Sequence, residues 1–371
     1  MKSKKKFNFY GNCIIIHGFS NSLLYDLDRG NYYIIPAFTA KTIEKRILGT
    51  FSVIHENHES EEDLTISEWL GKFSELGLGT FIDNCKSSKL PKISLEWDTP
   101  CMISNSIIFY NMNYFREIHD ALCRMNCQDI QIHVFEKRPD QNELTNISEI
   151  LLKSSIKTCE IVAVFSEDLN FDLLEKLVSE NKRFRRFYFS SSSRNEYYQC
   201  CTAVVLNSTQ KSFNSCGFIK HDYFTVNISL FTESLSYNTC LNRKLSIDKD
   251  GYIKNCPYME HHYGHISNTR IEDVVNLPEF QKWWHIKKDD IDVCKDCEFR
   301  HMCTDCRAFI KDPENIYSQP AKCTYNPYIC KWEGEEGYVP VEECGTYSRE
   351  TGFVPDKKKI KKLNKQICGD E

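Results

Sequence analysis

Short apolar runs alternate with turn residues at the start of the chain. Residues 13–16, 22–26 and 32–35 are rich in β-branched and aromatic side chains, and the turn residues 18–21 and 28–31 separate them. Apolar runs of this length between turn residues are typical of antiparallel strands. The pattern therefore predicts a three-stranded meander.

Two helices are expected after this meander. The first spans residues 38–48, directly after Pro36. A capping box at residues 65–68 opens the second helix, and Gly77 is its stop signal. Between these two signals the apolar residues have helical spacing: Ile66, Trp69, Leu70, Phe73 and Leu76.

From Lys89 onward, strand-like and helix-like segments alternate. Candidate strands are 106–110, 129–135, 160–165, 186–190, 202–206 and 224–229. Candidate helices are 114–125, 142–152 and 171–181. The run at residues 161–165 is apolar on both faces, as in a parallel strand that is covered by helices. These segments predict an α/β layer, which we expect to be an incomplete or degenerate barrel.

The cysteines become regularly spaced only in the later part of the chain. Of the 19 cysteines, eight lie between residues 240 and 330. They read C-x10-G-x4-C for Cys240 and Cys256, then C-x2-C-x5-C-x2-C for Cys294, Cys297, Cys303 and Cys306, followed by Cys323 and Cys330. Two C-x2-C pairs place four sulfurs on tight turns, which suits a metal or an iron–sulfur cluster better than disulfides. A turn at residues 248–251 predicts a β-hairpin that brings Cys240 and Cys256 to one end of a small sheet.

Length and charge narrow the class of protein. The chain has 371 residues, enough for two or three domains at about 150 residues each. Its net charge is -5, and the basic residues form no extended stripe, so nucleic acid is not expected as the main partner. No apolar run approaches the roughly 20 residues of a membrane span, and no signal core follows the first residues, which predicts a cytoplasmic protein. In a reducing compartment, 19 cysteines favour metal ligands and buried thiols over a disulfide framework.

The order of the cysteines resembles the SPASM domain of peptide-modifying radical SAM enzymes. The family usually has three residues before the fourth clustered cysteine, whereas this chain has two. The resemblance implies that one auxiliary [4Fe–4S] cluster is held by Cys294, Cys297, Cys303 and Cys323. It assigns Cys240, Cys256 and Cys306 to a second cluster.

The fourth thiolate of the second cluster is not evident in the sequence. The family's frequent extra cysteine is absent between Cys240 and Cys256. The site is therefore open, or is completed by another residue, or holds no cluster. His261, His262 and His265 are candidates because imidazole can replace a thiolate on iron, and the alternative is that they are exposed loop residues. Zinc competes with iron for the four-cysteine set.

The meander and its helices resemble the winged-helix-like peptide-recognition domain found at the front of many ribosomal-peptide maturation proteins. The resemblance rests on residues 12–17, 24–27 and 31–36. In that family a leader peptide adds as a fourth strand to the exposed sheet edge, so that main-chain hydrogen bonds supply affinity. The alternative is a small domain that only packs on its neighbour.

The middle of the chain lacks the cysteines of radical SAM chemistry. SPASM enzymes carry a C-x3-C-x2-C loop after an early barrel strand, but residues 111–115 contain no cysteine. Cys123 and Cys127 have the first spacing, and Ile130 stands where the third thiolate would be. We expect two half-buried thiols near a helix end, and a protein that is not a functional radical SAM enzyme. No glycine-rich nucleotide-binding turn is found either.

Two further features surround the cysteines. Trp283 and Trp284 precede the clustered cysteines and are expected to pack against the small sheet and to shield sulfur from water, with a substrate platform as the alternative. Residues 356–365 are strongly basic, which predicts a solvated tail.

As a whole the chain resembles the SPASM-containing maturases of grasp-with-spasm systems, which are encoded with an ATP-grasp ligase and a short precursor peptide. The resemblance implies a leader-recognition domain at 1–88, a degenerate radical-SAM-like partial (β/α) barrel at 89–235, a SPASM iron–sulfur domain at 236–335 and a basic tail at 336–371. It implies maturation of a ribosomally synthesised peptide (a RiPP), with the ligase as partner. The alternatives are a stand-alone peptide-modifying enzyme with an open cluster site and a structural zinc-binding adaptor.

Overall fold

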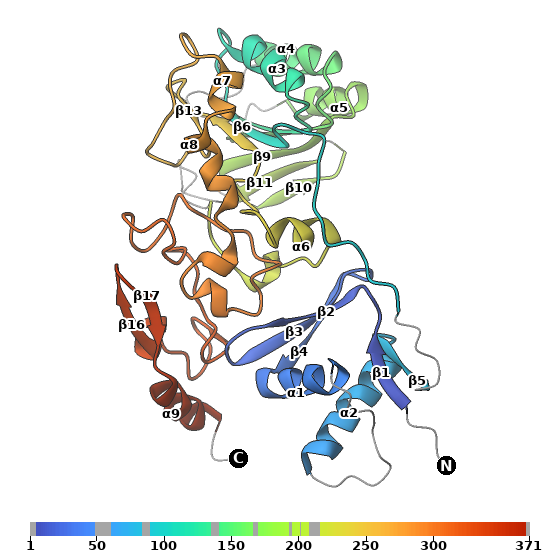
Figure 1. Ribbon diagram of the computed structural model, residues 1–371. Helices are drawn as coiled ribbons and strands as arrows, with labels where there is room; N and C mark the ends of the chain where they lie inside the picture. Colours follow the sequence, from blue (N-terminus) through green and yellow to red (C-terminus); the bar gives the residue numbers. More distant parts are fainter. Residues whose placement is uncertain are drawn as a thin grey trace.

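The chain folds into an elongated molecule with a sheet near each end and the cysteine-rich segment between them (Figure 1). The computed structural model describes residues 5–48, 61–83, 90–134, 141–165, 170–192, 195–200, 202–207 and 216–368. The domain boundary expected between residues 88 and 89 lies outside these ranges.

The N-terminal sheet is the expected meander. Strands β2 (Cys13–His17), β3 (Asn21–Asp26) and β4 (Asn31–Pro36) are antiparallel and lie in the order β2-β3-β4. Helix α1 (Ala37–Leu48) follows β4 directly, as the sequence predicted. Strands β1 (Lys5–Phe9) and β5 (Gly79–Asp83) pair with each other in a separate antiparallel ribbon.

Helix α2 (Glu61–Glu75) begins earlier than the capping box suggested. Glu61, Glu62 and Asp63 form its first turn, where carboxylates interact favourably with the helix dipole. Thr65 therefore lies inside the helix, and its hydroxyl donates a hydrogen bond to the Glu61 carbonyl at 3.1 Å. The expected N-cap role of residue 65 is wrong.

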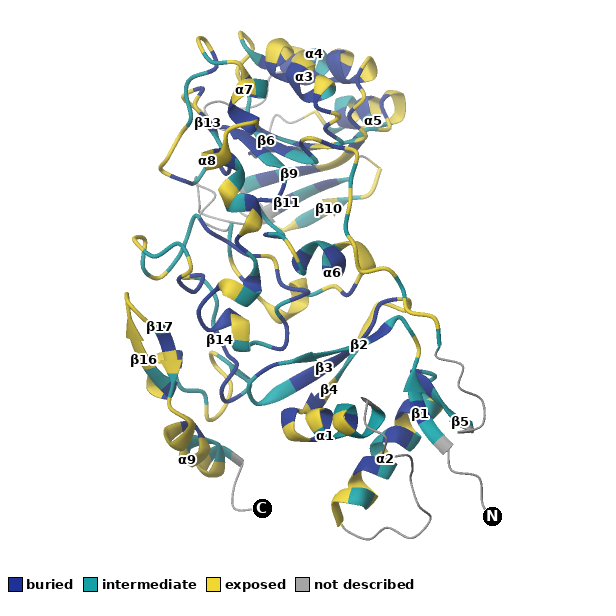
Figure 2. Cartoon of the chain, in the orientation of Figure 1, coloured by how far each residue is buried: buried dark blue, intermediate teal, exposed yellow. Residues whose placement is uncertain are grey.

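The central strand of the N-terminal sheet is buried on both faces, as Figure 2 shows for β3. On one face Leu24 packs in a core with α1 and α2. On the other face Leu23 and Tyr25 pack with Phe299 and Tyr325 of the cysteine-rich segment. The outer strands β2 and β4 pair with β3 only. Among the described residues, no further strand pairs with their outer edges.

The large sheet has eight strands in the order β10-β11-β9-β8-β7-β6-β12-β13. Its parallel part consists of β6 (Asn105–Phe109), β7 (Asp129–Val134), β8 (Thr158–Val164), β9 (Phe184–Ser192), β11 (Ala203–Asn207) and β12 (Lys244–Ile247). Strands β10 (Glu196–Tyr198) and β13 (Ile253–Lys254) are antiparallel edges. Helices α3 (Phe115–Arg124), α4 (Gln141–Leu152) and α5 (Phe171–Glu180) lie together on one side of this sheet (Figure 1). The mixed α/β layer is thus confirmed, as an open sheet.

Two expectations for this region are wrong. The segment 224–229 is no strand, because Asn227 caps helix α6 (Ile228–Ser234) by accepting a hydrogen bond from the Leu230 amide at 2.8 Å. The hairpin β12-β13 forms no small sheet of its own. It extends the large sheet, since β12 pairs in parallel with β6.

The C-terminal segment is packed, which corrects the expected solvated tail. Strands β16 (Gly345–Ser348) and β17 (Gly352–Pro355) form a hairpin, and helix α9 (Lys357–Cys368) follows. Asp356 accepts hydrogen bonds from the amides of Lys358 and Lys359, and Ile360 is buried against Tyr328. The lysines cover only the solvent face of an amphipathic helix.

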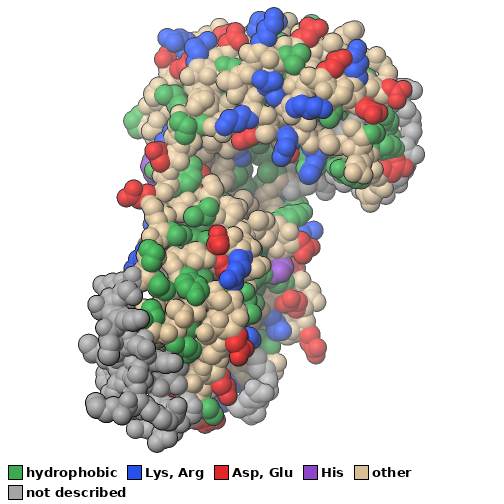
Figure 3. All heavy atoms as spheres, turned by 90° about the vertical axis from the view of Figure 1, so that its right-hand side faces the viewer, with side chains coloured by type: hydrophobic (Ala, Val, Ile, Leu, Met, Phe, Trp, Pro, Cys, Tyr) green, Lys and Arg blue, Asp and Glu red, His purple; other side chains and the backbone are tan. Residues whose placement is uncertain are grey.

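The remaining elements are short and position the cysteines. They are α7 (Ile271–Val275), α8 (Pro278–Gln281), β14 (Tyr325–Asn326), β15 (Lys331–Trp332) and the 3-10 turns η1 (His221–Tyr223), η2 (Lys282–His285), η3 (Lys288–Asp290), η4 (Cys294–Asp296) and η5 (Val341–Cys344). None of the described helices is long and apolar enough to cross a membrane. On the face shown in Figure 3, Lys and Arg side chains are interspersed with Asp and Glu.

Candidate cysteine-rich site

The first predicted ligand set lines a single cavity. Cys294, Cys297, Cys303 and Cys323 all contribute to its wall. Turn η4 carries Cys294, and Cys297 caps its C-terminal end. Tyr325 and Trp332 of the β14-β15 region also line the cavity, and the exposed surface of its wall is apolar. The structure therefore brings together the four cysteines that the resemblance to the SPASM domain assigned to one cluster.

Burial makes these thiols hard to ionise without a positive partner. It raises the pKa of Cys294 and of Cys303 to about 11, and Lys288 opposes this rise at both. Lys288 is 3% exposed as a residue, and its ammonium lies 3.8 Å from the Cys294 sulfur. Burial lowers the pKa of Lys288, but the negative charges of the Cys294 and Cys303 thiolates and of Asp305 outweigh it, so its pKa lies well above the ordinary value. This lysine keeps its charge and favours thiolates in the cavity.

The four thiols line one cavity without meeting at a single point. Among the described residues, no group of three or more His, Cys, Asp or Glu side chains is close enough to hold one metal ion. The thiolates of a four-iron cluster each bind a different iron, whereas four thiolates on zinc meet at one atom. A shared cavity lined by four cysteines is compatible with a cluster, and zinc with four cysteine ligands stays the alternative.

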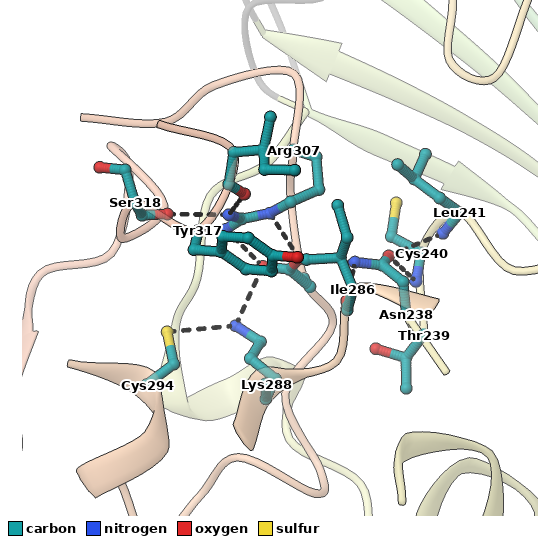
Figure 4. Close-up of polar contacts among 12 residues, drawn as sticks. Asn238, Thr239, Cys240, Leu241, Ile286, Lys288, Cys294, Arg307, Tyr317 and Ser318 are labelled. Atoms are coloured by element: carbon teal, nitrogen blue, oxygen red, sulfur yellow. Dashed lines mark hydrogen bonds and ion pairs between the residues drawn. The ribbon is translucent and has the colours of Figure 1, made fainter. Parts of the chain in front are cut away.

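A buried polar network links this cavity to the second cysteine set (Figure 4). Lys288 pairs with Asp305 at 3.5 Å, and Arg307 pairs with the same carboxylate at 2.6 Å. The Asn238 side chain donates to Asp305 at 2.6 Å and accepts from the Cys240 amide at 3.1 Å. One buried carboxylate therefore fixes both the lysine beside Cys294 and the turn that carries Cys240.

The second set lies at the base of the β12-β13 hairpin, which the turn residues had predicted. Gly251 takes a φ of 85° in this turn, a conformation that glycine adopts without strain. Cys256 is buried in a small apolar cluster that Cys240 and Ala308 contact. Burial raises the pKa of Cys256 to about 12. The Lys244 ammonium lies 3.6 Å from the Cys240 sulfur, as Lys288 does at the first set.

A further cysteine lies beside this second set. Cys216 interacts electrostatically with Cys240, Cys256 and Cys306, although it lies before the regular motif. Sequence reasoning missed it because no fixed spacing ties it to Cys240. The one feature of the neighbouring sequence that could have drawn attention to Cys216 is Gly217, which follows it.

The other candidate residues lie elsewhere. His265 contacts the Asp250 carbonyl and the Ser267 hydroxyl through its two ring nitrogens, each at 2.8 Å, so its place is in the hairpin loop. His261 and His262 are exposed. The histidines are therefore poor candidates for the missing ligand.

Cys330 is not in the wall of the first cavity and contacts the Pro327 carbonyl instead.

The side chains of Trp283 and Trp284 pack in different regions of the protein. Trp283 contacts both the apolar cluster around Cys256 and the one around Cys294. Trp284 belongs instead to the core of the large sheet, where its ring packs edge-on against Phe280. Only Trp283 lies between the two cysteine sets.

Cys123 and Cys127 form no third site. The Cys127 thiol is fully buried and donates to the Asp129 carbonyl at 3.4 Å, and burial raises its pKa to about 12. Cys123 is half-buried and contacts His119 and Ser154. The loop between β6 and α3 contains no cysteine.

Comparisons with known proteins agree with the position of the cysteine-rich segment. Residues 239–298 match the SPASM family model, an iron–sulfur cluster-binding domain. No curated protein matches the chain.

Similar solved structures include Streptococcus suis SuiB bound to S-adenosylmethionine, at 10% identity over 81% of this chain and 96% of that one, with a TM-score of 0.29. They also include SuiB bound to precursor peptide SuiA, at 12% identity, with the same coverage and a TM-score of 0.30. TM-scores this low establish no shared activity. What the comparisons show is a match to an iron–sulfur cluster-binding SPASM domain over a segment that contains Cys240, Cys256, Cys294 and Cys297.

Proposed function

We propose that the protein is an iron–sulfur protein of ribosomal-peptide maturation, which binds the leader of a precursor peptide and works with an ATP-grasp ligase. The proposal that the protein binds an iron–sulfur cluster rests on the cavity that Cys294, Cys297, Cys303 and Cys323 share. Cys240, Cys256 and Cys306 belong to a second cluster. A [4Fe–4S] cluster bound at either site supplies electron transfer or structural support.

The metal part is tested by elemental analysis. Anaerobically purified protein is expected to contain iron and acid-labile sulfide, and the Cys294→Ala/Cys297→Ala variant should lose a large share of both. About one zinc per chain, without iron or sulfide, would instead establish the structural zinc alternative.

Strand β4 is the proposed leader-binding edge. Its outer side pairs with no other strand among the described residues. Ile34 and Phe38 are large apolar side chains beside it, and they are 50% and 71% exposed. An unpaired strand next to exposed apolar side chains suits addition of a peptide strand, with main-chain hydrogen bonds for affinity and apolar contacts for specificity.

The register identifies which amides of β4 are free to pair. The Ala37 amide donates to the Ser20 carbonyl at 3.0 Å, one pair beyond the end of the β3-β4 ladder. Hydrogen-bonded pairs alternate along antiparallel strands, so Tyr33 pairs with Leu24 and the Ile34 amide points away from β3. By the same alternation the Tyr32 amide also points outward, so Tyr32 and Ile34 have the N–H groups that a leader strand could use.

The binding test uses the full chain, because one face of the N-terminal sheet packs on the cysteine-rich segment. The probe is a fluorescent synthetic leader of the precursor peptide that this proposal expects to be encoded beside the protein. Ile34→Pro removes one outward N–H while it leaves the β3-β4 ladder in place, and it should weaken binding at least about tenfold. Ile34→Ala keeps the N–H and should lose less.

Two results would contradict the leader-binding assignment. One is unchanged affinity of Ile34→Pro for the leader. The other is an equal loss in Ile34→Pro and Ile34→Ala, which would assign the effect to the side chain rather than to strand addition.

A further inference from the structure

We propose that Cys216 is the fourth ligand of the second site and completes it with Cys240, Cys256 and Cys306. The inference rests on the proposed cluster at that site. It replaces an open coordination position with a thiolate from outside the regular cysteine motif.

The backbone of Cys216 is held beside the loop that follows Cys306. Lys322 donates a hydrogen bond to the Cys216 carbonyl at 2.8 Å, and its ammonium lies 3.7 Å from the centre of the Phe309 ring. Ile219 also forms a parallel bridge with Cys323. The segment is thus tied to the residue range that carries ligands of both sites.

Gly217 allows this close approach. Its φ is 82°, and a Cβ at this position would lie 2.8 Å from the Cys306 sulfur. Any larger residue would both strain the backbone and collide with that sulfur. The backbone directly after Cys216 therefore touches a predicted ligand of the second site.

The charges around the four sulfurs support a common site. Cys216 lies close enough to Cys240 and to Lys244 for their charges to interact, and Lys244 interacts in the same way with Cys240 and Cys256. A single cation is shared by several thiols of this set, as Lys288 is at the first site. No histidine among the described residues occupies this position.

A complete thiolate shell has a chemical consequence. Four protein ligands leave no iron exposed for a substrate, so the second cluster cannot act as a Lewis acid without losing a ligand. The inference therefore speaks against a stand-alone enzyme that works through an open site at this cluster.

The test compares the isolated second site with and without Cys216. In the Cys294→Ala/Cys297→Ala background, the remaining cluster is reconstituted anaerobically and reduced with dithionite to its paramagnetic [4Fe–4S]+ state. It is then probed with 15N-imidazole by pulsed electron paramagnetic resonance. The background protein should retain iron and sulfide and show no nitrogen coupling. Adding Cys216→Ala should either remove most of that iron or produce an iron that binds imidazole. Cys200→Ala, at an exposed cysteine, should change neither property.

The outcomes separate the inference from the proposed function. Iron and sulfide in the wild-type protein test the proposed function alone. Imidazole coupling in the background protein, or an unchanged cluster after Cys216→Ala, overturns the fourth ligand while the proposed function stands. Circular dichroism of the metal-free variants shows whether Cys216→Ala still folds. If it does not, Cys216→Ser, which keeps the side-chain size, decides: loss of iron or an altered resonance supports the inference, and an unchanged resonance overturns it.

Discussion

The Lys288 ammonium lies 3.8 Å from the Cys294 sulfur in a fully protein-enclosed environment. Lys244 has the same relation to Cys240 at 3.6 Å. Each cysteine set thus has one cation within contact distance of a sulfur, buried in the case of Lys288 and partly buried in the case of Lys244. Several thiolates close together repel one another, and a fixed positive charge offsets part of this repulsion.

Removing the first of these cations should make the cluster harder to reduce. Reduction adds negative charge, which Lys288 stabilises, so Lys288→Met is expected to shift the reduction potential to more negative values. Lys295→Met is the matched control, because Lys295 is exposed and water screens its charge. Anaerobic redox titration measures both. Equal potentials for wild type and Lys288→Met would contradict the electrostatic role.

Asp305→Ala should strongly destabilise the cysteine-rich segment. The substitution leaves Lys288 and Arg307 buried without their carboxylate, and breaking a buried pair in this way costs about 3–5 kcal/mol. Asp250→Ala, at an exposed ion pair with Lys249, should change stability by no more than about 0.5 kcal/mol. Anaerobic urea unfolding provides the comparison. A similar midpoint for the two variants would be evidence against the network.

His133 should make the stability of the protein depend on pH. Burial lowers its pKa from 6.5 to about 3, so the folded protein keeps it neutral where the unfolded chain takes up a proton. Its contribution to stability is full above pH 6.5 and is lost as the pH falls towards 3, by up to about 1.4 kcal/mol per pH unit. His133→Gln should flatten the dependence between pH 5 and 6.5, and the exposed His262→Gln should not. Thermal unfolding at a series of pH values measures this slope, and equal slopes in wild type and His133→Gln would refute it.

The protein should not cleave S-adenosylmethionine reductively. The loop after β6 has no cysteine, and the Cys127 thiol is buried against a carbonyl rather than free to bind iron. Reconstituted protein under strong reductant is therefore expected to yield no more 5′-deoxyadenosine than a cluster-free control, measured by chromatography. A clear excess of this product would show that radical chemistry uses other ligands.

Periodic hydrophobic patterns predicted the regular elements well, because burial of one face dictates the spacing of apolar residues. Helices α3 and α5 lie within a residue of their expected bounds. The failures arise where a single polar group decides the local structure. Asn227 starts a helix inside a strand-like run, and Asp356 starts one in a segment that composition alone marks as a tail.

Only the part of the candidate site whose residues lie close together in the sequence could be predicted. Cys294 and Cys297 are placed by one turn, and the expected set around them does share a cavity. Cys216 reaches the second set through tertiary contacts with Lys322 and Cys306, for which the sequence has no periodic signal. Lys244 and Lys288 could not be predicted from the sequence either. An isolated lysine in a polar stretch is expected to be solvent-exposed, and only tertiary contacts place these two beside sulfur.

The parallel pairing of β12 with β6 joins residues 244–247 to residues 105–108 in one hydrogen-bonded ladder. The cysteine-bearing hairpin is therefore the continuation of the large sheet rather than a detachable module. Separating the two parts of the chain near residue 236 would expose the backbone edge of β6 and leave the β12-β13 hairpin without its partner strand. Because the hairpin and β6 share one ladder, loss of metal at Cys240 and Cys256 should increase amide hydrogen exchange along β6, which lies far along the sequence from either cysteine.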